Sequence, residues 1–146
     1  MALRAETPYA LGSIIGCNAL GGIIDKYGTK NATFFTLLVC LLNESALLAY
    51  NERNVFGWSS YAIAGLCGMQ EGTLNTYGGA LLGNEFDDKI TPVSVVLVVK
   101  FFTLGSSMLA NSQLETVEEY RTNLLLMMVI SVVGVLAMTY FPFKHK

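Results

Sequence analysis

Apolar residues in this chain are grouped in long runs that short polar segments separate. Five runs, at residues 8–24, 32–50, 56–83, 90–110 and 123–143, approach the length needed to cross a membrane as a helix. A crossing takes about 20 helical residues, with about 17 as the lower limit, so the first run is short and the third is long enough to tilt. Because no alternating strand pattern is present, we expect an all-α bundle of about five transmembrane helices in a single domain, residues 1–146.

Composition supports a membrane as the solvent of this chain. Hydrophobic residues make up 53% of it and charged residues 14%, and the mean hydropathy is +0.49. A soluble domain of 146 residues normally carries more charge and fewer apolar residues. The formal net charge of −2, with basic residues scattered along the chain, excludes nucleic acid as an expected partner. We therefore expect an integral membrane protein.

Catalytic and metal-binding motifs are not found in the sequence. Cys17, Cys40 and Cys67 all fall inside predicted helices, and their number and spacing fit neither a disulfide framework nor a metal site. The sequence contains no nucleophile elbow, phosphate loop or haem motif. We expect no enzyme, no metal and no cofactor, although a bound lipid would suit the space beside the first run.

The segment from Gly21 to Phe35 interrupts the first two apolar runs with glycine, charge and turn-forming residues. Gly28 can adopt the left-handed conformation that ends a helix, and Asn31 is a good cap for the next one. This pattern alone predicts a connection near residues 25–31 between two antiparallel helices.

The same segment also resembles a known signature. Its pattern Gly21-x-x-x-Asp25-Lys26-x-Gly28-x-Lys30 is similar to the loop that joins the second and third spans in each half of major facilitator superfamily transporters. The resemblance implies that Gly21 permits close approach of a neighbouring helix. It also implies that Asp25 takes part in a charge and capping network at a gate.

A second resemblance covers residues 68–77, 83–86 and 100–102, which look like parts of the second half of the uncoordinated-ninety-three-like branch of that superfamily. Together the two resemblances imply spans eight to twelve of a twelve-span transporter, or alternatively spans two to six. We expect a complete small protein with about half of a major-facilitator-type fold. Such a half cannot enclose an alternating-access cavity alone, because that cavity lies between two halves.

Three ionisable residues lie inside predicted spans: Glu44, Glu71 and Lys100. A charge at the middle of a bilayer costs about 3 kcal/mol on insertion scales, so each should face protein, water or a partner charge. With Asn75, one turn after Glu71, they are the candidate site residues. They could bind substrate or carry a proton, or they could form a structural ion pair such as Lys100 with Glu71.

Two further patterns predict local structure. The motifs Gly12-x-x-x-Gly16, Gly68-x-x-x-Gly72 and Gly79-x-x-x-Gly83 indicate close contacts between helices, which membrane proteins use for packing whatever their function. The sequence Thr116-Val-Glu-Glu119 matches a capping box, which starts a short surface helix or leads into the fifth span.

Two functions are compatible with these features. The first is a non-catalytic accessory subunit of a larger membrane complex, derived from a transporter half and in contact with other membrane subunits and lipids. For it we expect an energy-converting organelle, namely the mitochondrial inner membrane and its respiratory chain. The second is a half-size, proton-coupled transporter of an unknown small molecule that pairs with itself or a partner, with Glu44, Glu71 and Lys100 lining the cavity.

Overall fold

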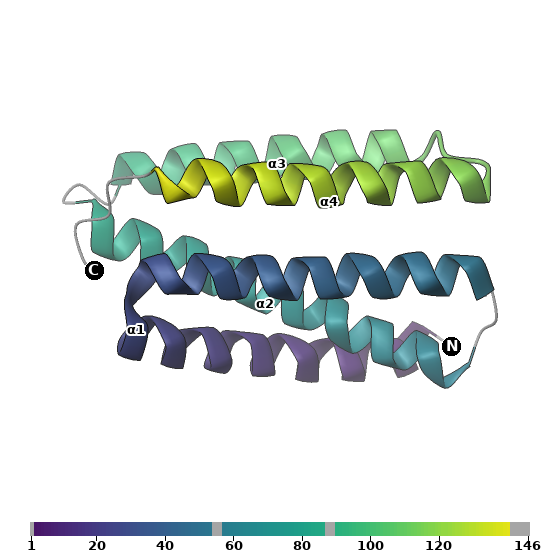
Figure 1. Ribbon diagram of the computed structural model, residues 1–146, viewed down its shortest axis with the longest axis horizontal. Helices are drawn as coiled ribbons and strands as arrows, with labels where there is room; N and C mark the ends of the chain where they lie inside the picture. Colours follow the sequence, from purple (N-terminus) through teal and green to yellow (C-terminus); the bar gives the residue numbers. More distant parts are fainter. Residues whose placement is uncertain (1, 54–56, 87–89, 141–146) are drawn as a thin grey trace.

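The computed structural model describes residues 2–53, 57–86 and 90–140, and within these ranges the chain is helical with no strand (Figure 1). The elements are α1 (Ala2–Arg53), α2 (Trp58–Glu85), α3 (Ile90–Asn111) and α4 (Val117–Thr139). The prediction of an all-α chain is therefore confirmed for the described residues.

Helix α1 consists of two helices that Gly28 separates, and we call residues 2–27 its first arm and residues 29–53 its second arm. Gly28 has φ 80° and ψ 169°, a region that is essentially open only to glycine. The predicted antiparallel turn is present, but it occupies this single residue and not a loop from 25 to 31 (Figure 1). Asn31 does not cap the second arm, because its Nδ2 donates to the carbonyl of Tyr27 at 2.8 Å.

The helices alternate in direction, so that their ends meet at two ends of the bundle (Figure 1). The N-terminus, the start of α2 and the start of α4 lie at one end, whereas the turn at Gly28 and the start of α3 lie at the other. Helix α2 packs against α1, α4 packs against α1 as well, and α3 lies in the same layer as α4 (Figure 1) with few contacts to any other helix. The core is therefore built mainly by α1 and α2.

The helices cover the apolar runs, with one clear difference at α4. This helix begins at Val117, six residues before the predicted run, because the capping box is formed. The hydroxyl of Thr116 accepts from the backbone N–H of Glu119 at 3.2 Å, and Glu119 Oε2 accepts from the backbone N–H of Thr116 at 3.0 Å. The pattern thus leads into the fifth run. Residues 141–143, where that run was predicted to end, lie outside the described part.

Among the described residues, two helices are long and apolar enough to cross a membrane. They are Glu6–Glu52, which contains both arms of α1, and Val117–Met138 in α4. In α3 the stretch Pro92–Thr103 is apolar but shorter, and α2 does not qualify. The structure therefore does not confirm a bundle of five spans, and crossings by α2 and α3 stay predictions.

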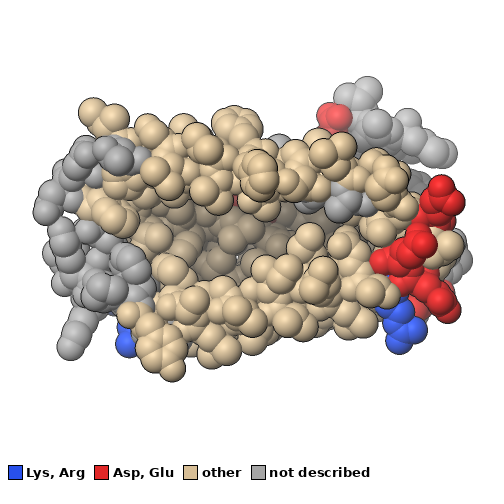
Figure 2. All heavy atoms as spheres, turned by 90° about the horizontal axis from the view of Figure 1, so that it is seen from above, with Lys and Arg blue, Asp and Glu red and all other residues tan. Residues whose placement is uncertain are grey.

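The polarity of the bundle differs from that of a soluble protein. Its few buried residues include Leu20, Ala32, Val39 and Cys40 but also six polar residues: Thr29, Thr33, Thr36, Asn43, Glu44 and Thr73. By contrast, all five residues from Val95 to Val99 are exposed. Figure 2 shows charged atoms gathered near the ends of the bundle, with a broad uncharged band between them that is hollowed between α3 and α4. The described surface therefore suits apolar surroundings better than water.

Glycines bring the first arm of α1 against α2. A Cβ atom at Gly12 or Gly16 would overlap a carbonyl oxygen of α2, and one at Gly68 or Gly72 would overlap a carbonyl oxygen of the first arm. Two of the three predicted glycine motifs thus form close helix contacts. The third, Gly79-x-x-x-Gly83, does not, because nothing lies within 4 Å of a Cβ atom at either position.

We predict that Gly28→Ala destabilises the chain by about 1–3 kcal/mol, because a Cβ atom is strained at this φ and ψ. Chemical unfolding in mild detergent, followed by circular dichroism, measures the change. Gly22→Ala is the matched control, since nothing lies within 4 Å of a Cβ atom there and alanine is the better helix former. Equal stability of the two variants would contradict the assigned turn.

A second comparison tests the glycine interface. Gly72→Val should destabilise the bundle by about 1–3 kcal/mol or more, because the added atoms would overlap the backbone of the first arm. Gly79→Val carries the same change in helix propensity at an open position, so the difference between the two unfolding midpoints isolates the contact. A similar loss for both variants would show that close packing at Gly72 is not required.

Candidate functional site

A chamber of about 750 Å³ lies between the second arm of α1, α2 and α4, next to the last residue of α3. The described residues that line it share a high content of amides and aromatic hydroxyls: Asn43, Glu44, Leu47, Tyr50, Asn51, Cys67, Gln70, Asn111, Tyr120, Asn123, Leu124 and Met127. We refer to this space as the Glu44 chamber. Its volume is in the range of small-molecule sites.

One wall of the Glu44 chamber is a hydrogen-bonded contact between α1 and α2. The amide Nδ2 of Asn43 donates to Oε1 of Gln70, and the thiol of Cys67 donates to Oδ1 of Asn43 at 3.4 Å. Asn43 is buried. Because a buried amide costs free energy unless it is bonded, these bonds fix the register of the second arm on α2.

Glu44 connects α1 to α4 from the other side. Its Oε1 accepts a hydrogen bond from the Ser131 hydroxyl at 3.1 Å, and only 6% of the residue is exposed. Its Oε2 is also buried but has no hydrogen-bond partner in the described structure. A buried carboxyl oxygen without a hydrogen-bond partner costs free energy, and Glu44 is the chamber residue that carries this cost.

The other end of the chamber reaches the end of the bundle. Asn51 lies near the end of α1, and its Nδ2 donates to the carbonyl of Val117 at the start of α4 at 3.2 Å. Nearby, Nδ2 of Asn123 donates to Oδ1 of Asn111 at 3.2 Å. Seven helical residues separate Asn51 from Glu44, which places the carboxyl about 10 Å deeper along the helix axis. The chamber thus runs from an amide-rich rim inward to Glu44.

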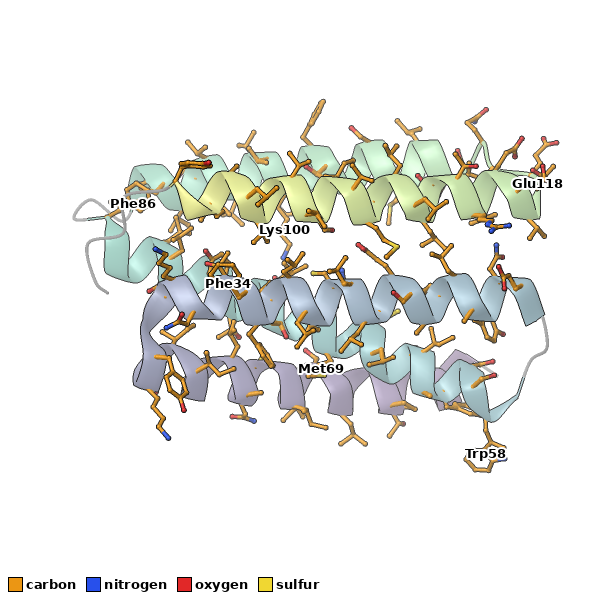
Figure 3. The ribbon with its side chains drawn as sticks, viewed as in Figure 1. Phe34, Trp58, Met69, Phe86, Lys100 and Glu118 are labelled. Atoms are coloured by element: carbon orange, nitrogen blue, oxygen red, sulfur yellow. The ribbon has the colours of Figure 1, made fainter. Side chains whose placement is uncertain are left out.

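The other candidate residues lie outside this chamber. Glu71 is exposed on α2. Lys100 extends from α3 toward the lower layer of helices (Figure 3), where its Nζ donates to Oδ1 of Asn75 at 2.7 Å. Within the described residues no ion pair joins Lys100 to Glu71, so the suggested structural pair is not present. Lys100 and Asn75 instead line a separate apolar groove of about 490 Å³ between α2 and α3.

The residues of the signature-like loop do not form the network that the resemblance implies. A Cβ atom at Gly21 would have nothing within 4 Å, so this glycine permits no close helix approach here. Asp25 and Lys30 are exposed, and neither has a hydrogen bond or ion pair to another described residue. The ammonium of Lys26 lies 5.3 Å from the ring centre of the adjacent Tyr27. Only Gly28 has a clear structural role.

Several chamber residues were not identified as site residues from the sequence. Gln70 and Asn43 were noticeable as amides next to Glu71 and Glu44, but their contact depends on how α1 and α2 pack. Ser131 could not be identified as a site residue from the sequence, because a serine in an apolar helix is common. The three cysteines are free, and the described residues contain no group of three or more His, Cys, Asp or Glu that could hold a metal ion.

Comparisons of the chain with protein-family profiles, with curated proteins and with solved structures find no match. The likeness to major facilitator transporters therefore stays a prediction from short motifs. The geometry of the bundle and of the Glu44 chamber is therefore the remaining guide to function.

The Asn43–Gln70 contact predicts a pattern of stabilities in a double-mutant cycle. Asn43→Leu or Gln70→Leu alone should cost about 1–3 kcal/mol, since each leaves a polar partner unbonded in the interior. The double variant should cost less than the sum, because no polar partner of this bond is then left unpaired. Unfolding of the four proteins in mild detergent measures the coupling, and strictly additive losses would contradict the contact.

Proposed function

We propose that this chain is an integral membrane protein that serves as a non-catalytic accessory subunit of a larger membrane assembly. The observation that carries the proposal is the exposure of α3, whose apolar residues 95–99 face every side of the helix yet barely pack against the rest of the chain. A helix that is apolar on all sides belongs in the core of a large protein or in a membrane.

The exposed side chains of α3 support this proposal in detail. Successive residues point in directions about 100° apart, so the exposed run from Val95 to Val99 covers every side of the helix. Phe101 and Phe102 are also exposed, at 68% and 76%. The groove between α2 and α3 and the hollow between α3 and α4 add surface that close packing would fill (Figure 2). In the proposed assembly, neighbouring subunits and lipid occupy this groove and this hollow.

Dimensions and end groups support placement in a membrane. Helix α4 has 23 residues, or about 34 Å at 1.5 Å per residue, against a hydrocarbon thickness of about 30 Å. Trp58 begins α2 at one end of the bundle and points away from it (Figure 3), while Tyr140 follows α4 at the other end. They are 89% and 88% exposed, as aromatic residues at the two membrane surfaces would be.

The described helices would form only part of a carrier. Family carriers hold substrate between two pseudo-symmetric halves, and α1 to α4 supply the helices for less than one half, so a carrier would need further helices from another source. Descent from such a half is part of the proposal and rests on the sequence resemblance of residues 21–30 and 68–77 alone, since Gly21 and Asp25 do not make the described contacts that the resemblance implies. The mitochondrial inner membrane stays a prediction, which fractionation of cells that express the tagged chain would test.

The assembly proposal predicts the size of the native particle. After gentle solubilisation of its own membrane, the chain should migrate with other polypeptides in a particle several times larger than 15.9 kDa plus detergent. A photo-crosslinker in place of Val98 should join α3 to one of those polypeptides, because this position points out of the bundle with 69% exposure. A monomer, or a dimer near twice the chain mass, would contradict the proposal.

The Glu44 chamber favours one alternative, a half-size transporter that pairs with a second copy or a partner. If the chain transports a solute with protons, Glu44→Gln should abolish uptake into reconstituted vesicles. Glu71→Gln should leave uptake unchanged, because Glu71 lies outside the chamber. Uptake that survives Glu44→Gln would exclude this alternative as framed here.

A further inference from the structure

We propose that the Glu44 chamber is a binding site for a small organic cation that carries an alkylated ammonium group. The inference goes beyond the role of an accessory subunit and does not rest on it. It is carried by three observations together: the buried carboxyl with one oxygen that has no partner in the described structure, the charge balance of the lining, and the apolar and amide groups in the same cavity.

The charge balance calls for a cation. Glu44 is the only acidic residue among the described residues that line the chamber, and none of them is Lys or Arg. The Ser131 hydroxyl bonds one carboxyl oxygen, while Oε2 has no partner in the described structure. An isolated buried carboxylate is strongly unfavourable, and a bound cation supplies the missing counter-charge.

The remaining lining suits an alkylated ammonium group. Tyr50 and Tyr120 line the rim of the chamber, where their rings can attract an entering cation through the negative charge on their faces. Leu47, Leu124 and Met127 provide apolar surface for methyl groups. The amides of the rim and of the Asn43–Gln70 wall can bond a hydroxyl elsewhere on the ligand.

An inorganic divalent ion fits the chamber less well. Calcium takes six to eight oxygen ligands at about 2.3–2.6 Å, several of them carboxylates, and zinc takes four nitrogen, sulfur or carboxylate ligands. The described residues contain no group of three or more His, Cys, Asp or Glu that could hold a metal ion. A volume of about 750 Å³ is also far larger than one ion needs, whereas it accommodates a small organic molecule.

The experiment measures binding by isothermal titration calorimetry. The full chain is solubilised gently, together with any subunits that accompany it, and is titrated with choline and with 3,3-dimethyl-1-butanol, the uncharged isostere of choline. We expect saturable choline binding and at least about tenfold weaker binding of the neutral alcohol, because the isostere loses the charge interaction with Glu44.

Variants assign the effect to the chamber. Glu44→Gln keeps the shape of the side chain and should weaken choline binding by at least about tenfold, while Glu71→Gln on the exposed face of α2 should change it by less than about twofold. Circular dichroism of each variant checks that it is folded.

Three results would overturn the inference. They are no saturable choline binding to the folded wild-type chain, equal affinity for choline and its neutral isostere, and unchanged affinity in a folded Glu44→Gln variant. None of them depends on the size of the native particle, so failure here leaves the accessory-subunit proposal standing. Conversely, a small particle that binds choline through Glu44 would support this inference and contradict the accessory-subunit proposal.

Discussion

Backbone contact between the first arm of α1 and α2 is the constraint on which the rest of the bundle depends. At Gly12, Gly16, Gly68 and Gly72 the two helices approach so closely that a single added carbon would overlap a carbonyl oxygen. In lipid there is little hydrophobic force to hold helices together, so close packing of small residues takes its place. Once α2 is seated there, the turn at Gly28 brings the second arm of α1 against α2 as well.

That arrangement buries several polar side chains between α1 and α2, and some of these side chains form one wall of the candidate site. Thr33 bonds the hydroxyl of Tyr77 at 2.7 Å, and Asn43 bonds Gln70 further along the same interface. Such bonds are specific, because each donor must meet its acceptor at one register. Glu44 lies at the edge of this interface, where the described part of α4 supplies one hydrogen bond, from Ser131, and a cavity lies beside the carboxyl. Hydrogen bonds thus fix the register of α1 on α2 as far as the edge of the chamber.

Much of the fold could be predicted from local patterns because its causes are local. The apolar runs set the helices, Gly28 sets the turn through its backbone freedom, and Thr116 with Glu119 starts α4 through a capping box that spans four residues. The candidate site was less predictable. Glu44 and Glu71 look alike in sequence, each next to an amide in an apolar helix, yet one is buried and the other exposed. Their directions depend on how α1 and α2 rotate against each other.

By itself, the sequence determined an all-helical chain, a turn near Gly28 and the glycine motifs available for packing, because each depends on residues close together in the chain. Only the tertiary structure decided which glycine motifs form helix contacts, since Gly79-x-x-x-Gly83 forms none. It also decided which polar residues are bonded to each other. Lys100 bonded Asn75 and not Glu71, and Glu44 reached Ser131, 87 residues away. Such pairings depend on the rotation and register of helices about their axes, which no single apolar run specifies.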